Sequence, residues 1–438
     1  MTLTNRATYL FVIIGVLYLS VGVLESWSLA LTILNDGLIA AIMALGVNMM
    51  WGYAGLFNIG IAGFFSLGGL AVVLVSAPIN HEAWSAGTVQ ILFALAAGVA
   101  IVAASVRTVQ RGQSGWPRAL VLAGLAVAGV MLFKLVYLPA TESVEAINPA
   151  AAGNIGGLGL PVPFAWLVGA GLAAGAAWMV ARISLRLRSD YLAIATLGIG
   201  QIIISVQKNE DWLDRGVKDI YDISHWPVPD AVALQQADWF LSLAQRFGFD
   251  LQSGSTIAVN LAFATMTALV LGFILFLAEL SLKSPWGRMM RAIRDNETAA
   301  GAMGKDVRKR HLQIFVLGSA VVGIAGALFV MFHGIFSPRS FDDPLRYTFL
   351  IWAMVILGGS GNNWGAVLGA LVVMLIWIQA EYLGPLVLQV ATGPLSDGPL
   401  KAHLIDSAVQ MRLPLVGIVL IAVLRFSPRG LIPERGSK

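Results

Sequence analysis

The sequence contains no cysteine, which excludes disulfide bonds and thiol chemistry. Charged residues make up only 12% of its 438 residues, whereas an average soluble domain has about 25%. The five histidines lie far apart in the sequence, and neither a metal-ligand spacing nor a Ser/His/Asp arrangement can be recognised. We therefore expect no catalytic site, no bound metal and no cofactor. The charge distribution gives no indication of nucleic-acid binding.

A nucleotide-binding P-loop is also missing. The P-loop pattern is G-x-x-x-x-G-K-[ST]. The nearest string, residues 301–306, has the wrong spacing and ends in Asp306. We do not expect the chain to hydrolyse ATP, so any ATP-driven step would need a separate subunit.

Long apolar segments dominate the chain, which is 58% hydrophobic with a mean hydropathy of +0.79. A bilayer-crossing helix needs about 20 mostly apolar residues, and about twelve segments meet or approach this length. They centre on residues 9–24, 29–51, 57–77, 87–106, 119–138, 162–181, 191–207, 256–282, 312–334, 347–359, 364–389 and 412–426. The third is interrupted by polar and Gly residues, and the tenth is short. We predict an all-α, polytopic integral membrane protein with about twelve transmembrane helices, forming one domain over residues 1–438.

The distribution of Lys and Arg predicts the orientation of these helices. Residues 107–118, 182–188, 284–311 and the tail after residue 424 are basic, and twelve spans place them all on the side of the N-terminus. The positive-inside rule puts that side, and both termini, in the cytoplasm. Residues 208–254 are acidic and Trp-rich, and would be an external (periplasmic) loop. They would form either a small folded subdomain or an interfacial loop with aromatic anchors.

The most strongly charged connection between spans is the segment 284–311. It carries seven basic and three acidic residues, which are Arg288, Arg291, Arg294, Lys305, Arg308, Lys309 and Arg310, and Asp295, Glu297 and Asp306. Residues 296–304 contain helix formers and end in a Gly that can stop a helix. Composition alone favours contact with anionic lipid, and docking of another protein is the alternative.

Several motifs follow one another along most of the chain. They are ALGVN at residues 44–48 with GYAG at 52–55, SDYLAIATLG at 189–198, SPWGR at 284–288, ETAA at 297–300 with Gly304, GIAGAL at 323–328, MVILGG at 354–359 and RFSPRGL at 425–431. In this order they resemble the branched-chain amino acid permease family of ABC importers, LivM type. Residues 78–160 carry no such motif and look like an inserted helical hairpin with loops.

The resemblance implies a permease subunit of an ATP-driven ABC importer in a bacterial inner (plasma) membrane. Such a subunit would carry branched-chain amino acids, or a related small polar or organic solute, by alternating access. The implied partners are a LivH-type permease subunit, two cytoplasmic ABC ATPase subunits and a periplasmic substrate-binding protein, in addition to the lipid bilayer. The alternative is a self-sufficient secondary transporter or channel. The sequence has few charges in its apolar segments that suit ion coupling, which argues against that alternative.

Within the segment 284–311, the ETAA motif resembles the cytoplasmic loop that docks into the ATPase in this family. The candidate ATPase-coupling residues are Arg294, Glu297, Ala299, Ala300 and Gly304.

Two further sets of residues are candidates for the solute path. The first set lies where Gly and polar residues interrupt predicted spans, namely Asn58, Gly60, Thr196, Gly198 and Gln201. Broken helices mark substrate sites in transporters, but these Gly residues would equally permit close helix packing. The second set, Asp36 and Glu279, consists of ionisable residues near or within spans. They are either functional or solvated close to the membrane surface.

Overall fold

The computed structural model describes residues 3–110, 116–147, 153–221, 223–393, 398–399, 403–404 and 407–434. These ranges contain helices and no β-strand. Nine of their helices are long and apolar enough to cross a membrane, and Ile61–Ser76 and Leu345–Gly358 are shorter apolar helices. The predicted all-α polytopic architecture is therefore confirmed. The third span is the main difference, because the chain stays non-helical from residue 55 to residue 60 and the helix begins only at Ile61.

Helices occupy the positions of all the predicted spans. In chain order they are α1 (Leu3–Leu24), α2 (Trp27–Ala54), α3 (Ile61–Ser76), α5 (Val89–Gln110), α6 (Trp116–Leu132), α8 (Val162–Ser184), α9 (Ser189–Asn209), α13 (Leu251–Lys283), α16 (Val307–His333), α17 (Leu350–Gly358), α18 (Asn363–Ala391) and α20 (Arg412–Phe426). Of these, α3, α17 and α20 are the short ones.

Helix α2 lies at the centre of the bundle and is buried along most of its length. It packs against α13, α16, α17 and α18, while α3 and α8 pack against α16. Glycines make these close contacts possible: a Cβ on Gly68 of α3 would collide with the backbone of Gly323 in α16, and one on Gly46 of α2 would collide with the backbone of Gly318. Van der Waals packing of small residues is a main source of helix association in a membrane.

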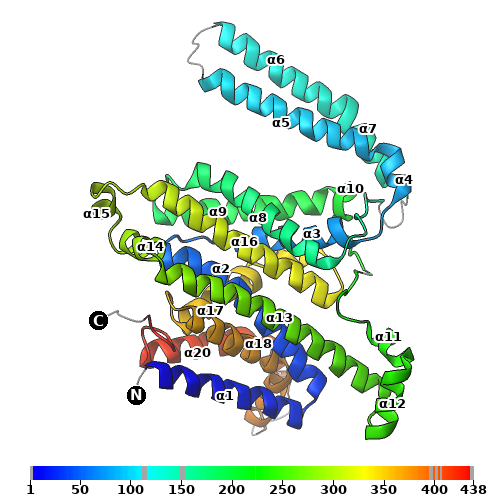
Figure 1. The fold of residues 1–438 in the computed structure, drawn as a ribbon, viewed down its shortest axis with the longest axis vertical. Helices are drawn as coiled ribbons and strands as arrows, with labels where there is room; N and C mark the ends of the chain where they lie inside the picture. Colours follow the sequence, from blue (N-terminus) through cyan, green and yellow to red (C-terminus); the bar gives the residue numbers. More distant parts are fainter. Residues whose placement is uncertain are drawn as a thin grey trace.

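The helices of residues 81–145 form a hairpin that stands apart from the bundle (Figure 1). One arm is α4 (His81–Ala83), the π-helical turn η1 (Trp84–Thr88) and α5; the other is α6, the π-helical turn η2 (Phe133–Tyr137) and α7 (Leu138–Glu145). Helix α6 has no buried residue. Residues 111–115 and 148–152 of the predicted hairpin segment 78–160 lie outside the described residues. That this hairpin is an insertion relative to the family stays a prediction.

The coupling candidates and the chain ends share one end of the molecule. Figure 1 shows α14 (Pro285–Asp295) and α15 (Glu297–Ala302) at the same end as the start of α1 and the end of α20. Arg6 and Ser427 connect the two terminal regions, because Nη2 of Arg6 donates a hydrogen bond to Oγ of Ser427 (2.9 Å). The segment 208–254 lies at the opposite end, as the orientation analysis expects.

Residues 208–254 have features of a small folded subdomain and also of an interfacial loop with aromatic anchors, the two structures considered for them. They contain α10 (Asp211–Asp214), α11 (Ala231–Gln236) and α12 (Asp238–Phe247), with a few buried apolar side chains such as Phe240. Trp239 and Phe247, however, are largely exposed, as expected for aromatic anchors at a membrane surface. Asp222 lies outside the described residues.

Candidate functional site

Side-chain caps divide the segment 284–311 into two short helices and the start of a span. Oγ of Ser284 accepts a hydrogen bond from the backbone N–H of Gly287 (3.3 Å) and begins α14, with Pro285 in its first turn. Oδ1 of Asn296 accepts from the N–H of Ala299 (2.9 Å) and begins α15. Asp306 caps α16 in the same manner. Ser, Asn and Asp are preferred at these positions because they satisfy N–H groups that have no helical partner.

Two arginines of α14 fold back onto the helix that precedes it. Nη1 of Arg288 donates to the carbonyl oxygen of Lys283 (3.1 Å), and Nη2 of Arg291 donates to that of Leu282 (3.3 Å). Basic side chains are favourable at a helix C-terminus, where carbonyl groups lack helical partners. These arginines therefore fix the angle between α13 and α14. Sequence reasoning had given them only a role in topology and lipid contact.

Arg294 holds the segment 284–311, which contains the candidate ATPase-coupling residues, against the bundle. Its Nη1 donates to the backbone oxygen of Gly52 at the end of α2. Its Nη2 lies 3.0 Å from Oε2 of Glu434, and its Nε lies 3.2 Å from Oδ1 of Asp295. One side chain thus joins α14, α2 and the C-terminal region. The predicted ATPase contact of Arg294 is untested and stays a prediction.

The tip of the segment is formed by small, exposed residues. Glu297, Ala299 and Gly304 are exposed, whereas Ala300 is buried against the neighbouring helices. Gly304 has a φ of +76°, and a Cβ there would meet no atom within 4 Å. Met303, beside it, is 79% exposed. The tip is therefore free to contact another protein, while Ala300 anchors it.

Polar side chains form a buried network close to Arg294. Nδ2 of Asn48 donates to Oδ1 of Asn363 (3.1 Å), and the hydroxyl of Tyr53 donates to the same oxygen. Nδ2 of Asn363 donates to Oε1 of Glu279 (3.0 Å). The network connects α2, α13 and α18. Glu279 had been recognised from the sequence, but Asn363 had not, although its place directly after a Gly-rich break between two apolar segments was a usable signal.

Three of the five solute-path candidates, Asn58, Gly60 and Thr196, lie together at the non-helical segment 55–60 between α2 and α3. Oγ1 of Thr196 accepts from the N–H of Ile59 (3.1 Å), and Oδ1 of Asn58 accepts from the N–H of Gly60 (3.0 Å). A Cβ on Gly60 would collide with the backbone of Thr196. Asn58 and Thr196 are fully buried. These contacts satisfy backbone groups that lost their helical partners, as membrane-depth breaks require.

The other two path candidates lie elsewhere. Gly198 is exposed, and a Cβ on it would meet no atom within 4 Å. Gln201 is partly exposed. None of the five lines the cavity described next, and their role in the solute path stays a prediction.

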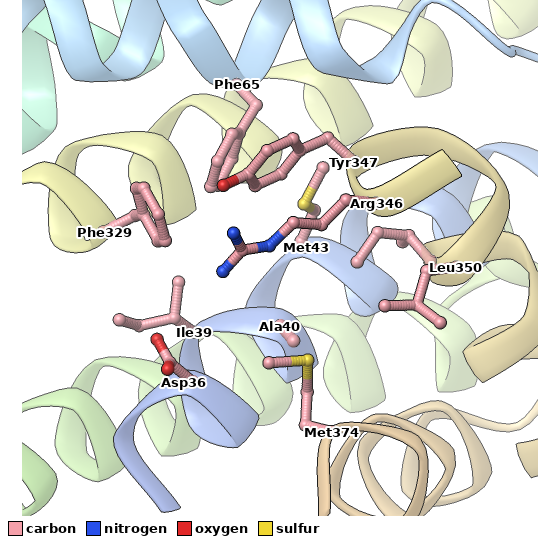
Figure 2. A pocket seen from close by; sticks show the side chains of 11 residues that line it. Asp36, Ile39, Ala40, Met43, Phe65, Phe329, Arg346, Tyr347, Leu350 and Met374 are labelled. Atoms are coloured by element: carbon pink, nitrogen blue, oxygen red, sulfur yellow. The ribbon is translucent and has the colours of Figure 1, made fainter. Parts of the chain in front are cut away.

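A cavity lies between α2, α3, α16, α18 and the π-helical turn η4 (Leu345–Phe349), with a volume of about 380 Å³ including its open mouth. Its wall is mainly apolar, and Asp36 and Arg346 bring opposite charges into it (Figure 2). Asp36 is 8% exposed, and its Oδ1 lies 3.0 Å from Nε2 of His333. Asp36, one of the two ionisable candidates, is therefore buried and lines a cavity.

Sequence reasoning missed Arg346 and Tyr347. Tyr347 is the first residue of the short tenth apolar segment, and Arg346 lies directly before it, so neither was considered as a candidate. The position of a basic residue directly before this short apolar segment was the only indication in the sequence. It does not show which helices the side chain will face.

Comparison with known sequences decides the family. Residues 29–114 and 117–424 match the family described as the permease component of the branched-chain amino acid transport system. The chain belongs to this family. The match includes all the helices that line the cavity and the whole of residues 284–311.

Individual relatives agree with this assignment. The chain is 27% identical over 329 residues to the probable branched-chain amino acid transport permease protein LivM of Methanocaldococcus jannaschii, covering 72% of the chain and 84% of the relative. It is 32% identical over 211 residues to the high-affinity LivM permease of Escherichia coli K12, covering 46% of the chain and 47% of that protein. It is also 28% identical over 147 residues to LivH of Salmonella typhimurium, covering 32% of the chain and 46% of that protein. No solved structure gives a significant match.

Membership of the family supports a multi-pass transport permease rather than an enzyme. The chain is similar in sequence to both permease types, LivM and LivH.

Proposed function

We propose that the chain is the membrane-spanning permease subunit of an ATP-driven ABC importer in a bacterial inner membrane. Its substrates would be branched-chain amino acids or related small solutes. Its partners would be a LivH-type permease, two cytoplasmic ATPase subunits and a periplasmic binding protein. The family match supports the permease role, and the absence of a P-loop from the sequence supports a separate ATPase.

The observation that carries the proposal is the construction of the coupling segment. An exposed tip at Glu297, Ala299 and Gly304 is joined through Arg294 to the end of α2. A push on α15 would therefore be transmitted to the central helix of the bundle. ATP binding can shift a two-state transporter only through a contact that differs between the two states, and this tip provides the surface for such a contact.

Both termini would face the cytoplasm, on the side of α15. The basic charge of residues 284–311 supports this orientation. Residues 208–254, at the opposite end, would then receive the loaded binding protein. A self-sufficient secondary transporter is not favoured by the family match.

The test is reconstitution. The chain is placed in proteoliposomes alone, or with its partner permease, ATPases and binding protein, and uptake of labelled leucine is measured with and without ATP. We expect uptake only from the complete set and only with ATP. Uptake by the chain alone, driven by an ion gradient, would establish the alternative function instead.

Direct contact at the tip can be tested separately, because the chain has no cysteine. Ala299→Cys, combined with single cysteines in the ATPase, should give a disulfide cross-link in the assembled complex. Ala176→Cys on α8, far along the chain from the tip, is the matched negative control.

A further inference from the structure

The segment that follows α20 returns to the bundle and packs against it. We call residues 427–434 the strap. Oγ of Ser427, at its start, accepts a hydrogen bond from Arg6 of α1 (2.9 Å), and Ile432 near its other end is only 4% exposed. The strap lies against the end of α17 and against the α17–α18 turn, which comprises residues 359–362. It is therefore an integrated part of the fold.

The strap completes the hydrogen bonding at the end of α17. The backbone N–H of Leu431 donates to the carbonyl oxygen of Leu357 (2.8 Å), and that of Ile432 donates to the carbonyl oxygen of Gly358 (2.9 Å). The last carbonyl groups of a helix have no N–H partner within the helix itself. Strap and helix end are consequently joined by bonds that do not depend on side chains.

Glycines bring the strap and the α17–α18 turn into backbone-to-backbone contact. A Cβ on Gly430 would collide with the Cα of Gly359, and a Cβ on Gly359 would collide with the carbonyl oxygen of Ile432. Both glycines have positive φ values, +83° and +116°, which side chains rarely permit. The contact leaves no space for a side chain between the two segments, so one cannot slide past the other without breaking it.

Side chains connect this pair of segments to α14. Nδ2 of Asn362 in the turn donates to the carbonyl oxygen of Pro433 in the strap (3.1 Å), while its Oδ1 accepts from the N–H of Gly365 (3.2 Å) and begins α18. Oε2 of Glu434 then lies 3.0 Å from Nη2 of Arg294 in α14. The contacts therefore run without interruption from α14 through the strap to the start of α18.

The turn itself lies close to the same arginine. A Cβ on Gly361 would lie 3.1 Å from Nη1 of Arg294 and 2.9 Å from Oε2 of Glu434. The N–H of Gly361 also donates to Oδ1 of Asn48 in α2 (2.8 Å). Movement of α14 thus cannot leave the turn unaffected.

We propose that the strap and the α17–α18 turn form a rigid coupling unit, which delivers the movement of α14 and α15 to α17 and α18. The contact of Arg294 with Gly52 of α2 would then be one of two outputs of the same movement. Residues of the strap act only through the helices they hold, so they are positioning residues. The proposal rests on the proposed importer function and adds to it the element that moves α17 and α18.

Two substitutions interrupt the unit at different contacts. Glu434→Gln removes the charge that pairs with Arg294, and Asn362→Asp removes the donor to Pro433 but keeps the oxygen that begins α18. Leucine uptake and ATP hydrolysis are measured in the complete transporter in proteoliposomes. We expect uptake per ATP to fall about three- to tenfold in each variant, the range for loss of one such contact. The yield of the complex and its ATPase rate should be those of the parent.

The double variant distinguishes a common unit from two separate defects. Because both contacts act in series, the double variant should match the more strongly affected single variant within about twofold, whereas independent effects would multiply. Glu381→Gln is the matched control. Glu381 lies 3.7 Å from Arg412 and is about 27 Å along α18 from Asn363 at 1.5 Å per residue. Its uptake per ATP should be that of the parent.

Rigidity can be tested directly because the chain contains no cysteine. Ser360→Cys in the turn and Pro433→Cys in the strap provide two thiols, which a short, reducible bis-methanethiosulfonate reagent can link. We expect cross-linking with and without ATP, and no change in uptake per ATP when the link is present. Loss of uptake that a reductant restores would show that the strap leaves the turn during transport. Failure to cross-link would show that it does not lie there. Either result would overturn the proposal.

The outcomes separate this proposal from the importer function. A parent complex without ATP-driven uptake would refute the importer, whereas the cross-link would still report the position of the strap. ATP-driven uptake by the parent, with unchanged coupling in Glu434→Gln, Asn362→Asp and the double variant, would retain the importer and refute the coupling unit. A lower yield of the complex with unchanged uptake per ATP would also refute it, because the strap would then have only a structural role.

Discussion

Nη2 of Arg294 lies 3.0 Å from Oε2 of Glu434, and this ion pair joins the segment 284–311 to the C-terminal region. Both side chains are mostly buried, and Arg294 also donates to Gly52 of the central helix. The cytoplasmic end of the proposed transporter is therefore organised around one arginine that contacts segments from the start, middle and end of the bundle.

Replacing Arg294 with Gln should weaken coupling between ATP hydrolysis and uptake. Loss of a partly buried ion pair and its hydrogen bonds destabilises by about 1–3 kcal/mol, so the chain should still assemble. We expect ATPase activity in the reconstituted complex to persist while leucine uptake per ATP falls several-fold. Arg308→Gln is the control, since Arg308 is an exposed arginine of the same charged segment. If both variants behave alike, Arg294 has no special role in transmission.

Gly304 should accept a larger residue only with backbone strain, although there is space for a Cβ at this position. Its φ of +76° lies in the left-handed region, which costs a non-glycine residue about 1–2 kcal/mol. Gly304→Trp should therefore distort the exposed tip and uncouple ATPase activity from uptake, although subunits still co-purify. Gly301→Ala is the control, because Gly301 lies in α15 and a Cβ there meets no atom within 4 Å. Normal uptake by Gly304→Trp would show that the tip does not transmit the ATPase motion.

Substitutions of Gly60 and Gly198 distinguish between the two roles considered for these glycines, close helix packing and lining of the solute path. A Cβ on Gly60 would collide with the backbone of Thr196, whereas one on Gly198 would enter open space. Gly60→Ala should lower the free energy of unfolding by about 1–3 kcal/mol, as overpacking does, and a thermal unfolding assay in detergent would detect it. Gly198→Ala should leave both stability and leucine uptake unchanged. A changed substrate preference in Gly198→Ala would support its place in the path.

Asp214, in the segment 208–254, should make that segment sensitive to pH. Burial raises the pKa of its carboxyl to about 8 from an ordinary 3.8, and Asp211 and Glu210 contribute to the rise. The folded segment then keeps a proton that the unfolded segment releases. Its stability should therefore be highest below about pH 4, fall as the pH rises to about 8, and change no further above that value.

Hydrogen–deuterium exchange of peptides covering residues 208–221, corrected for the intrinsic pH dependence of exchange, measures this effect. Asp214→Asn should remove most of the pH dependence because it fixes the neutral form. Asp230→Asn, at an exposed position in the same segment, should leave it in place. An unaltered pH profile in Asp214→Asn would mean that another group titrates.

The sequence was sufficient to predict the helices but not their partners. Apolar length located the apolar helices, and ordered motifs indicated the family, because both signals lie in the local sequence. The start of α3 was misplaced by four residues, since Asn58 and Thr196 replace helical hydrogen bonds with a tertiary contact that no local pattern encodes. The role of Arg294 in ATPase coupling stays a prediction, and its contact with Glu434 could not be foreseen because it depends on how the chain ends fold back.

The cavity was beyond sequence reasoning for a similar reason. Asp36 was recognised as an ionisable residue in an apolar segment, whereas Arg346, directly before the tenth apolar segment, was not considered. Their common environment arises only when α2, α16 and η4 pack together. A one-dimensional pattern records the presence of both charges, but not that they face the same space.

The pairing of Arg294 with Glu434 also sets an order of events during biosynthesis. Arg294 leaves the ribosome before α16, α17, α18 and α20, so it has no Glu434 to pair with until those helices have been made. In a growing chain, Arg294 would therefore hold the segment 284–311 through Gly52 alone, and its second attachment would form only when the C-terminal region is in place.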